Sequence, residues 1–269
     1  MLMRYVTSVL LVLLLAACTS NARRIDRMAE TAGLDRLVVN AQGFPTLIYM
    51  KRGTIGADGS YPIFLEGDGR PWRNGTEPND DPTPRNPLAL NLLLETSGPS
   101  AYVARPCYHR LYTERCTSAQ WTSARYSEEI VSSMTDAVRQ VGQKVSARKL
   151  VLVGYSGGGA LAVLIAERLD SVSAVVTISA NLDIDTWTSQ HRYLPLTESL
   201  NPAESQYAHP WREIHLHGSR DTVVPPGTTA AYFARYPDAK NMLLDDFDHV
   251  CCWVERWPAL FDSLSKELQ

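Results

Sequence analysis

From position 36 onward, apolar residues fall into short unbroken runs that alternate with stretches of helical spacing. Strands are predicted at 61–65, 101–104, 149–153, 172–179, 213–216 and 241–244, and the runs at 149–153 and 172–179 are continuous, as is typical of strands buried on both faces. Apolar spacing predicts helices at 87–95, 127–145, 158–169, 226–236 and 257–268. Two further runs, at 37–39 and 46–50, flank a turn-rich hexapeptide and predict a starting hairpin. The alternation predicts an α/β fold with a mostly parallel central sheet and helices on both faces.

Two long segments follow neither period. Residues 71–87 are rich in Pro, Asn, Asp and Gly and predict a loop. Residues 182–212 contain Trp, Tyr and Pro without clear spacing and predict a small cap inserted over one end of the sheet. Because no internal repeat or linker interrupts the pattern, we expect one domain from 36 to 269.

The N-terminal segment 1–17 has the organisation of a secretory signal. Arg4 precedes an apolar run that ends at Leu15, and two small residues follow. The run is shorter than the roughly 20 apolar residues that a membrane span needs. We therefore expect this segment to be removed. Residues 18–35 are polar and predict either a short tether or a first surface helix.

The junction Leu15-Ala16-Ala17-Cys18 resembles the lipobox of bacterial lipoproteins. The resemblance implies cleavage before Cys18, acylation of Cys18 and membrane contact through this lipid anchor. Thr19 after the cysteine resembles the pattern sorted to the outer membrane, so the expected location is the cell envelope, facing the periplasm. An ordinary signal peptide with a chance cysteine at the junction is the alternative.

The charge balance argues against nucleic-acid binding. With 26 Lys and Arg against 29 Asp and Glu, the chain lacks the basic excess of a nucleic-acid binder.

The five cysteines are an odd number, so they cannot all pair with one another. Lipidation of one leaves an even set for an oxidising compartment. The default expectation is a local disulfide between Cys107 and Cys116. Cys251 and Cys252 then form a strained vicinal pair or stay as thiols, and a crossed pairing between the two sets is the alternative.

The strongest chemical signal is Gly154-Tyr155-Ser156-Gly157-Gly158, directly after the strand at 149–153 and before a helix. This strand-turn-helix context suits a nucleophile elbow, in which small neighbours allow close approach around a serine in a strained conformation. A phosphate-binding turn is the rival interpretation, but no lysine follows the glycines and no G-x-G-x-x-G is present.

A serine nucleophile needs a base and an orienting acid, and candidates follow in order along the chain. Asp221 follows the strand at 213–216 within His217-Gly218-Ser219-Arg220-Asp221, and His249 follows the strand at 241–244. With the elbow, these motifs resemble the alpha/beta-hydrolase fold family from Leu37 to the C-terminus, including dienelactone-hydrolase-like and prolyl-peptidase-like catalytic domains. The resemblance implies Ser156 as nucleophile, Asp221 as acid and His249 as base. The rival acids beside the histidine are Asp245, Asp246 and Asp248.

The same resemblance implies an oxyanion hole. One donor is the backbone N–H of Gly157, and the other comes from the loop 66–70 after the third strand. This loop departs from the H-G-G-G pattern of related lipases and esterases, because Glu66 and Asp68 replace a histidine and a glycine. We assign the backbone N–H groups of Gly67 and Asp68 as donors and expect the Asp68 side chain to turn away or pair with Arg70.

The expected activity is hydrolysis of a small carboxylic ester by a monomeric serine esterase without metal or cofactor. A peptidase or thioesterase using the same triad, or a non-catalytic envelope lipoprotein that binds a ligand, are the alternatives. His215 and His217 form an H-x-H pair on one strand, but no Cys or carboxylate set accompanies them, so packing is favoured over metal binding.

Overall fold

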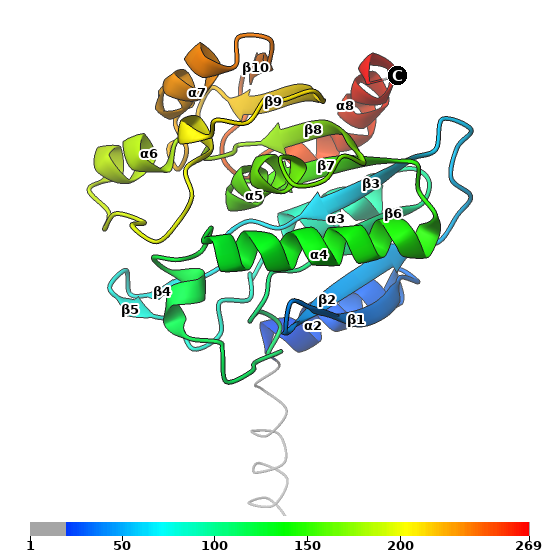
Figure 1. The fold of residues 1–269 in the computed structure, drawn as a ribbon, viewed down its shortest axis with the longest axis horizontal. Helices are drawn as coiled ribbons and strands as arrows, with labels where there is room; N and C mark the ends of the chain where they lie inside the picture. Colours follow the sequence, from blue (N-terminus) through cyan, green and yellow to red (C-terminus); the bar gives the residue numbers. More distant parts are fainter. Residues whose placement is uncertain (1–19, 269) are drawn as a thin grey trace, which may run out of the picture.

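An eight-stranded sheet lies at the centre of the computed structural model, which describes residues 20–268 (Figure 1). In spatial order the strands are β1 (Asp35–Ala41), β2 (Phe44–Lys51), β6 (Ser100–Val103), β3 (Ser60–Leu65), β7 (Lys149–Tyr155), β8 (Val172–Ile178), β9 (Arg212–Gly218) and β10 (Lys240–Leu244). Strands β1, β2 and β6 pair antiparallel, and every pairing from β6 to β10 is parallel. The predicted α/β class, the starting hairpin and the mostly parallel sheet are confirmed.

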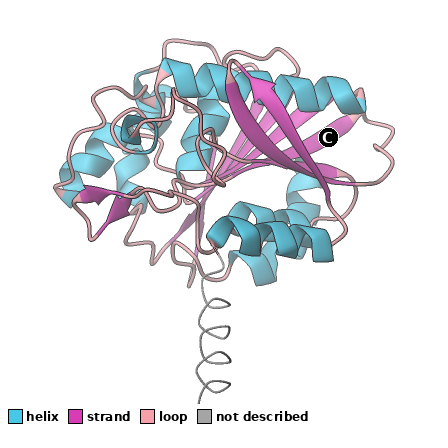
Figure 2. Ribbon diagram, turned by 90° about the horizontal axis from the view of Figure 1, so that it is seen from below, coloured by secondary structure: helices cyan, strands magenta, loops and turns pink. Residues whose placement is uncertain are grey.

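Helices cover both faces of this sheet, as Figure 2 shows with cyan helices on either side of the magenta strands. Helices α4 (Glu128–Val145) and α5 (Gly157–Ala166) pack on one face, and α2 (Asn21–Thr31), α3 (Leu88–Glu95) and α8 (Trp253–Glu267) pack on the other. Each face has its own apolar core, because strands buried on both sides present alternate side chains to the two layers.

Helix α4 illustrates how the local sequence specifies an element. Ser127 caps its first turn by accepting a hydrogen bond from the Ile130 N–H, and two glutamates occupy that turn. The helix ends where Ser146 adopts a left-handed conformation. Its buried side chains repeat at helical spacing and face the core: Ile130, Val131, Met134, Val138 and Val141.

The polar segment after the predicted signal forms a helix that belongs to the body of the protein. In α2, Ile25 is completely buried, and the Asn21 side chain donates a hydrogen bond to the Thr83 carbonyl oxygen at 3.3 Å. Of the two interpretations, the structure has the first surface helix at residues 21–31 and not a free tether, because one buried face attaches them to the sheet. The signal at 1–17 and Cys18 lie outside the described residues. Within residues 20–268, no helix combines the length and apolarity needed to cross a bilayer.

The two irregular segments contain more structure than the sequence predicts. Within the predicted loop 71–87, β4 (Trp72–Arg73) and β5 (Glu77–Pro78) form a short antiparallel pair. The cap region 182–212 contains α6 (Ile184–His191) and a single 3₁₀ turn, η2 (Pro202–Glu204). The helix predicted at 226–236 is divided into a 3₁₀ turn, η3 (Pro226–Thr229), and α7 (Ala230–Arg235). Each of these 3₁₀ turns begins with a proline, which is tolerated there because the N–H that it lacks would have no partner in a first turn.

Candidate active site

Three side chains singled out by the sequence follow three parallel strands. Ser156 follows β7, Asp221 follows β9 and His249 follows β10. Since the carboxyl ends of parallel strands meet at one edge of a sheet, these residues lie on the loops of the same edge. Helix α6 of the predicted cap segment 182–212 lies there too, because the Trp187 indole donates a hydrogen bond to the Val223 carbonyl oxygen at 2.7 Å.

Ser156 occupies a sharp turn between β7 and α5. Its backbone has φ of 51° and ψ of −123°, which is a costly conformation for a residue with a side chain. The Ser156 N–H donates to the Ile178 carbonyl oxygen at 2.8 Å and ties the turn to β8. A Cβ atom on Gly154 would overlap the Gly158 carbonyl oxygen, and one on Gly158 would overlap the Leu65 carbonyl oxygen. Glycine is therefore required on both sides of the serine.

Asp221 and His249 form a direct pair. The His249 Nδ1 atom lies 2.9 Å from Asp221 Oδ2, while Asp221 Oδ1 accepts hydrogen bonds from the N–H groups of Val223 and Val224. Asp221 is buried, which by itself would raise its pKa, but the hydrogen bond and charge of His249 and the Val224 N–H outweigh burial and hold that pKa below its usual value.

The rival acids have other partners. Asp248 Oδ1 accepts hydrogen bonds from the N–H groups of Val250 and Cys251, so this carboxylate closes the turn that follows His249. Asp246 is exposed and lies 3.5 Å from Arg220. Asp245 is also exposed. The geometry thus favours Asp221 over all three rivals.

The imidazole of His249 lies beside the elbow. The ring centroids of Tyr155 and His249 are 5.2 Å apart, and the Tyr155 hydroxyl donates to the His249 carbonyl oxygen at 3.1 Å. Among the described residues, the Ser156 hydroxyl makes no hydrogen bond to the His249 imidazole. Ser156 and His249, the candidate nucleophile and base, therefore lie on neighbouring segments without a direct hydrogen bond between them.

The loop after β3 contacts the elbow, as expected for a second oxyanion donor. An added Cβ on Gly67 would lie 3.3 Å from the Ser156 Cβ. However, the Gly67 N–H donates to Glu66 Oε1 at 3.1 Å, so it is not free to stabilise an oxyanion. Within residues 20–268 no acceptor is found for the N–H groups of Asp68 and Gly157. The geometry thus supports Asp68 and Gly157 as donors and speaks against Gly67.

Glu66 is buried in this loop. Its Oε1 atom also accepts a hydrogen bond from the Ala89 N–H in the first turn of α3, whereas Oε2 has no hydrogen-bond partner among the described residues. Burial raises the pKa of Glu66 to about 7, and the N–H groups of Gly67, Ala89 and Leu90 oppose this rise.

The Asp68 side chain does not pair with Arg70, contrary to the expectation from the sequence. Its two carboxylate oxygens lie 2.5 Å from Arg105 Nη1 and 2.6 Å from Arg125 Nη1. The Tyr126 hydroxyl donates to the same carboxylate. These partners come from the irregular stretch before α4, where no residue spacing pointed to the site.

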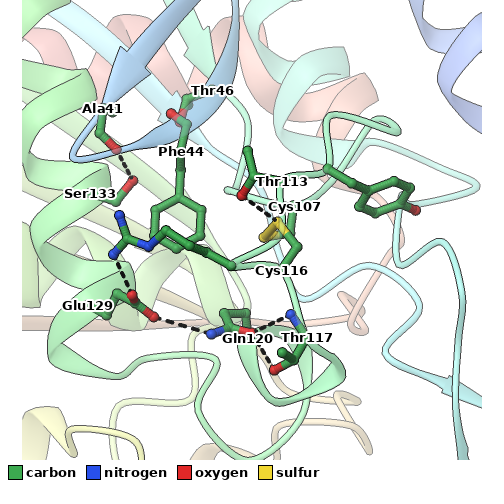
Figure 3. Close-up of a disulfide and its surroundings, with 12 residues drawn as sticks. Ala41, Phe44, Thr46, Cys107, Thr113, Cys116, Thr117, Gln120, Glu129 and Ser133 are labelled. Atoms are coloured by element: carbon green, nitrogen blue, oxygen red, sulfur yellow. Dashed lines mark hydrogen bonds and ion pairs between the residues drawn. A yellow bond between two sulfur atoms is a disulfide. The ribbon is translucent and has the colours of Figure 1, made fainter.

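Two disulfides are present in the described residues. Cys107 and Cys116 are joined, as the default pairing predicts, and Cys251 pairs with its neighbour Cys252. Around the first disulfide, Thr113 contacts Cys116, and Gln120 binds both Thr117 and Glu129 (Figure 3). This disulfide closes a short loop in the segment between Arg105 and Arg125, the two arginine partners of Asp68.

The H-x-H pair of β9 is buried and serves packing. The His215 ring binds Thr177 and Glu213 at 2.7 and 3.0 Å, and His217 is 1% exposed. Burial lowers the pKa of His217 to about 4. In the part of the chain that the structure describes, no cluster of His, Cys, Asp or Glu side chains is suited to hold a metal ion.

Comparison with protein-family models and with curated proteins finds no match. Solved structures do match. An esterase from Pyrococcus furiosus superposes with a TM-score of 0.62 at 13% identity, over 89% of this chain and 92% of that one. An alpha/beta serine hydrolase without lid from Xanthomonas campestris gives 0.58 at 11% identity, over 87% and 94%. A bacterial membrane phospholipase A gives 0.57 at 15% identity, over 98% of both chains. At such identities the likeness concerns the fold, and this chain has the alpha/beta-hydrolase fold.

Proposed function

We propose that the protein is a serine hydrolase that cleaves a carboxylic ester through an acyl-enzyme. The observation that carries the proposal is the Asp221–His249 pair beside a strained elbow serine, at one edge of the sheet. An orienting carboxylate and a nucleophile on a strand-to-helix turn are the parts that acyl transfer requires. The fold that this chain shares with solved esterases and serine hydrolases supports the same assignment.

In the proposed reaction, His249 removes the proton from the Ser156 hydroxyl as its oxygen attacks the ester carbonyl carbon. The carbonyl oxygen becomes an oxyanion that the N–H groups of Gly157 and Asp68 stabilise. The tetrahedral intermediate collapses, the alcohol leaves with the proton from His249, and an acyl-Ser156 ester remains. Water then attacks this ester with the same proton transfers, releasing the acid and restoring the serine.

The test is covalent labelling of the folded protein by a fluorophosphonate, which reacts with activated serines. We expect one labelled peptide, containing Ser156, and loss of labelling in Ser156→Ala. Absence of labelling would reject the enzyme and favour the non-catalytic binding protein. Matched ester, thioester and peptide amide substrates then separate an esterase from a thioesterase or peptidase, with the highest kcat/KM expected for the ester.

We also propose that Cys18 carries a lipid that anchors the enzyme to the cell envelope, at the outer membrane facing the periplasm. The apolar run that ends at Leu15 and the small residues before Cys18 support this proposal. Cells fed labelled palmitate should incorporate it into the wild type and not into Cys18→Ser. Equal incorporation by both proteins would reject lipidation at Cys18.

As a second candidate function, we propose hydrolysis of a more specific substrate class, the acyl esters of membrane lipids. Its support is a set of exposed apolar side chains on the loops around the candidate site: Tyr193, Leu194, Val223 and Val250, which are 54%, 75%, 43% and 51% exposed. Apolar side chains exposed beside a catalytic site are typical of enzymes that take substrate from a lipid surface. The membrane phospholipase A, which matches nearly the whole chain, supports the same substrate class.

Leu194→Glu tests this candidate. Hydrolysis of phospholipid in vesicles should fall about tenfold, because a charged side chain at that position opposes insertion into lipid. Hydrolysis of a short soluble ester should remain unchanged. Val38→Glu, which alters an exposed residue on the far edge strand β1, is the matched control and should affect neither substrate. Equal loss for both substrates in Leu194→Glu would reject a lipid-contact role.

A further inference from the structure

The carboxylate of Asp68 lies directly against the proposed oxyanion hole. A Cβ atom on Gly157 would overlap Asp68 Oδ1 and the Tyr126 hydroxyl, so these groups contact the backbone whose N–H faces the developing charge. An isolated carboxylate there would oppose a second negative charge and slow the reaction. The loop therefore needs compensating positive charge.

Two buried guanidinium groups provide that charge. The side chains of Arg105 and Arg125 are 1% and 5% exposed, and each donates to one oxygen of Asp68, whose side chain is 15% exposed. Burial would raise the pKa of Asp68, but the charges of Arg125 and Arg105 outweigh it and hold that pKa below its ordinary value. All three groups are thus ionised near neutral pH, and together they leave one net positive charge beside Gly157.

Further hydrogen bonds hold this cluster and the loop together. Arg105 also donates to the Arg125 carbonyl oxygen, and Arg125 Nε donates to the Thr122 carbonyl oxygen at 2.7 Å. The Tyr108 hydroxyl donates to the Asp68 carbonyl oxygen at 2.8 Å, which binds the backbone of the loop as well as its side chain. Burial raises the pKa of Tyr108 to about 12, so this phenol is a neutral donor.

Tyr126, which follows Arg125 in the chain, extends this cluster of side chains around Asp68. Tyr126 donates to both oxygens of Asp68, at 2.7 and 2.8 Å, and accepts a hydrogen bond from the Asn181 amide at 3.1 Å. Asn181 follows β8, the strand that also holds the Ser156 N–H through the Ile178 carbonyl oxygen. These hydrogen bonds join three segments at the proposed oxyanion hole: the loop after β3, the segment before α4 and the end of β8.

We propose that Arg105, Arg125 and Tyr126 are positioning residues that act through Asp68 to build the oxyanion hole. They fix the Asp68 backbone with its N–H unpaired, and the excess positive charge of the two arginines stabilises the oxyanion. This inference rests on the proposed serine hydrolase function. It adds an electrostatic role for buried side chains that do not touch the substrate.

The experiment compares Arg125→Gln with Arg125→Lys, since the first removes the charge and the second retains it. Kinetics on a soluble ester are combined with the affinity for a trifluoromethyl ketone. Ser156 adds to this ketone without a leaving group, the proton passes to His249, and the adduct oxygen remains an oxyanion. Arg125→Gln should lower kcat about 10- to 100-fold with KM little changed, and ketone affinity should fall by a similar factor. Arg125→Lys should recover most of both losses.

Arg168→Gln is the matched control, because it removes an arginine paired with Glu128 and Glu167 just after the C-terminal end of α5, whereas the elbow lies at the other end of that helix. It should lower Tm without changing ketone affinity. If Arg125→Gln lowers only Tm, with kcat and ketone affinity of the folded protein unchanged, the inference is overturned while the proposed function stands. A wild type that neither hydrolyses esters nor reacts with a fluorophosphonate overturns both.

Tyr126→Phe keeps the test decisive if Arg125→Gln does not fold. It removes the hydroxyl bonds to Asp68 while keeping the buried ring and every formal charge. We expect kcat and ketone affinity to fall together, by about three- to tenfold, with KM unchanged. Wild-type values for both quantities in Tyr126→Phe would overturn the inference.

Discussion

The Nδ1 atom of His249 lies 2.9 Å from Oδ2 of Asp221, although 28 positions separate the two residues in the chain. The other oxygen of Asp221 accepts two backbone N–H groups, so the carboxylate can rotate little. This arrangement places a proton on Nδ1 and leaves Nε2 as the basic nitrogen of the imidazole.

Replacing the acid should separate Asp221 from its rivals. Asp221→Asn keeps the shape of the side chain but favours the wrong tautomer of His249, so kcat for ester hydrolysis should fall about 10⁴-fold. Asp248→Asn should retain activity within roughly tenfold, because Asp248 accepts backbone N–H groups and does not contact the imidazole. Steady-state kinetics on a soluble ester measure both variants. A greater loss in Asp248→Asn would identify Asp248 as the acid.

Substitutions of Ser156 should separate activity from stability. Ser156→Ala and Ser156→Gly both remove the nucleophile, and both should abolish ester hydrolysis. Because φ at this position is 51°, Ser156→Gly should be more stable to unfolding than Ser156→Ala by about 1 kcal/mol. Urea denaturation of the two variants measures the difference. Equal stability would show that the turn imposes no strain on a side chain.

The buried Glu66 should make stability depend on pH. Its pKa is raised to about 7 in the folded protein from an ordinary value near 4.5, so its contribution is fully present below pH 4.5 and is lost as pH rises through 7. Glu66→Gln removes this titration. Relative to wild type, the free energy of unfolding of the variant should therefore increase by up to about 3 kcal/mol between pH 4.5 and pH 8.

Urea unfolding of wild type and Glu66→Gln at several pH values between 4.5 and 8 measures this dependence. Glu77→Gln, on the exposed β5, is the control and should track the wild type at every pH. A constant difference between Glu66→Gln and wild type across this range would contradict a raised pKa at Glu66.

The Cys107–Cys116 disulfide should contribute to stability by restricting the unfolded chain. The paired residues are 9 positions apart, and a loop of this length corresponds to about 2–3 kcal/mol. The double variant Cys107→Ser and Cys116→Ser should lose that amount in the free energy of unfolding under non-reducing conditions. The same denaturation in the presence of dithiothreitol should bring wild type and variant closer together. An unchanged gap under both conditions would assign the loss to packing of the sulfur atoms instead.

Local sequence accounts for most of the sheet and for the elbow. Strands such as β7 and β8 are recognisable because both of their faces are buried, which removes polar residues from the run. The turn at Ser156 is recognisable because glycine is required where the backbone of β7, α5 and the loop after β3 meet. Burial of both strand faces and the requirement for glycine at the turn each act on a few consecutive residues, so each can be recognised in the local sequence.

Other features depend on partners that local patterns do not reveal. Helix α2 was compatible with a tether because its composition is polar, and its attachment depends on Ile25 entering a core made by other elements. Gly67 and Asp68 looked equivalent as oxyanion donors. The choice between them depends on the Glu66 carboxylate, which occupies the Gly67 N–H.

By itself, the sequence determined the α/β fold class, the starting hairpin and the position of Ser156 in a strand-turn-helix context. It also determined the order in which the acid and base candidates follow. Tertiary structure decided the pairing of Asp221 with His249, the attachment of α2 and the partners of Asp68. Arg105 and Arg125 lie 37 and 57 positions from Asp68, and they meet it only because the strands and helices between them pack in one arrangement. Hydrophobic periodicity specifies which face of an element is buried, whereas charge pairing at a loop depends on distances that only the packed chain defines.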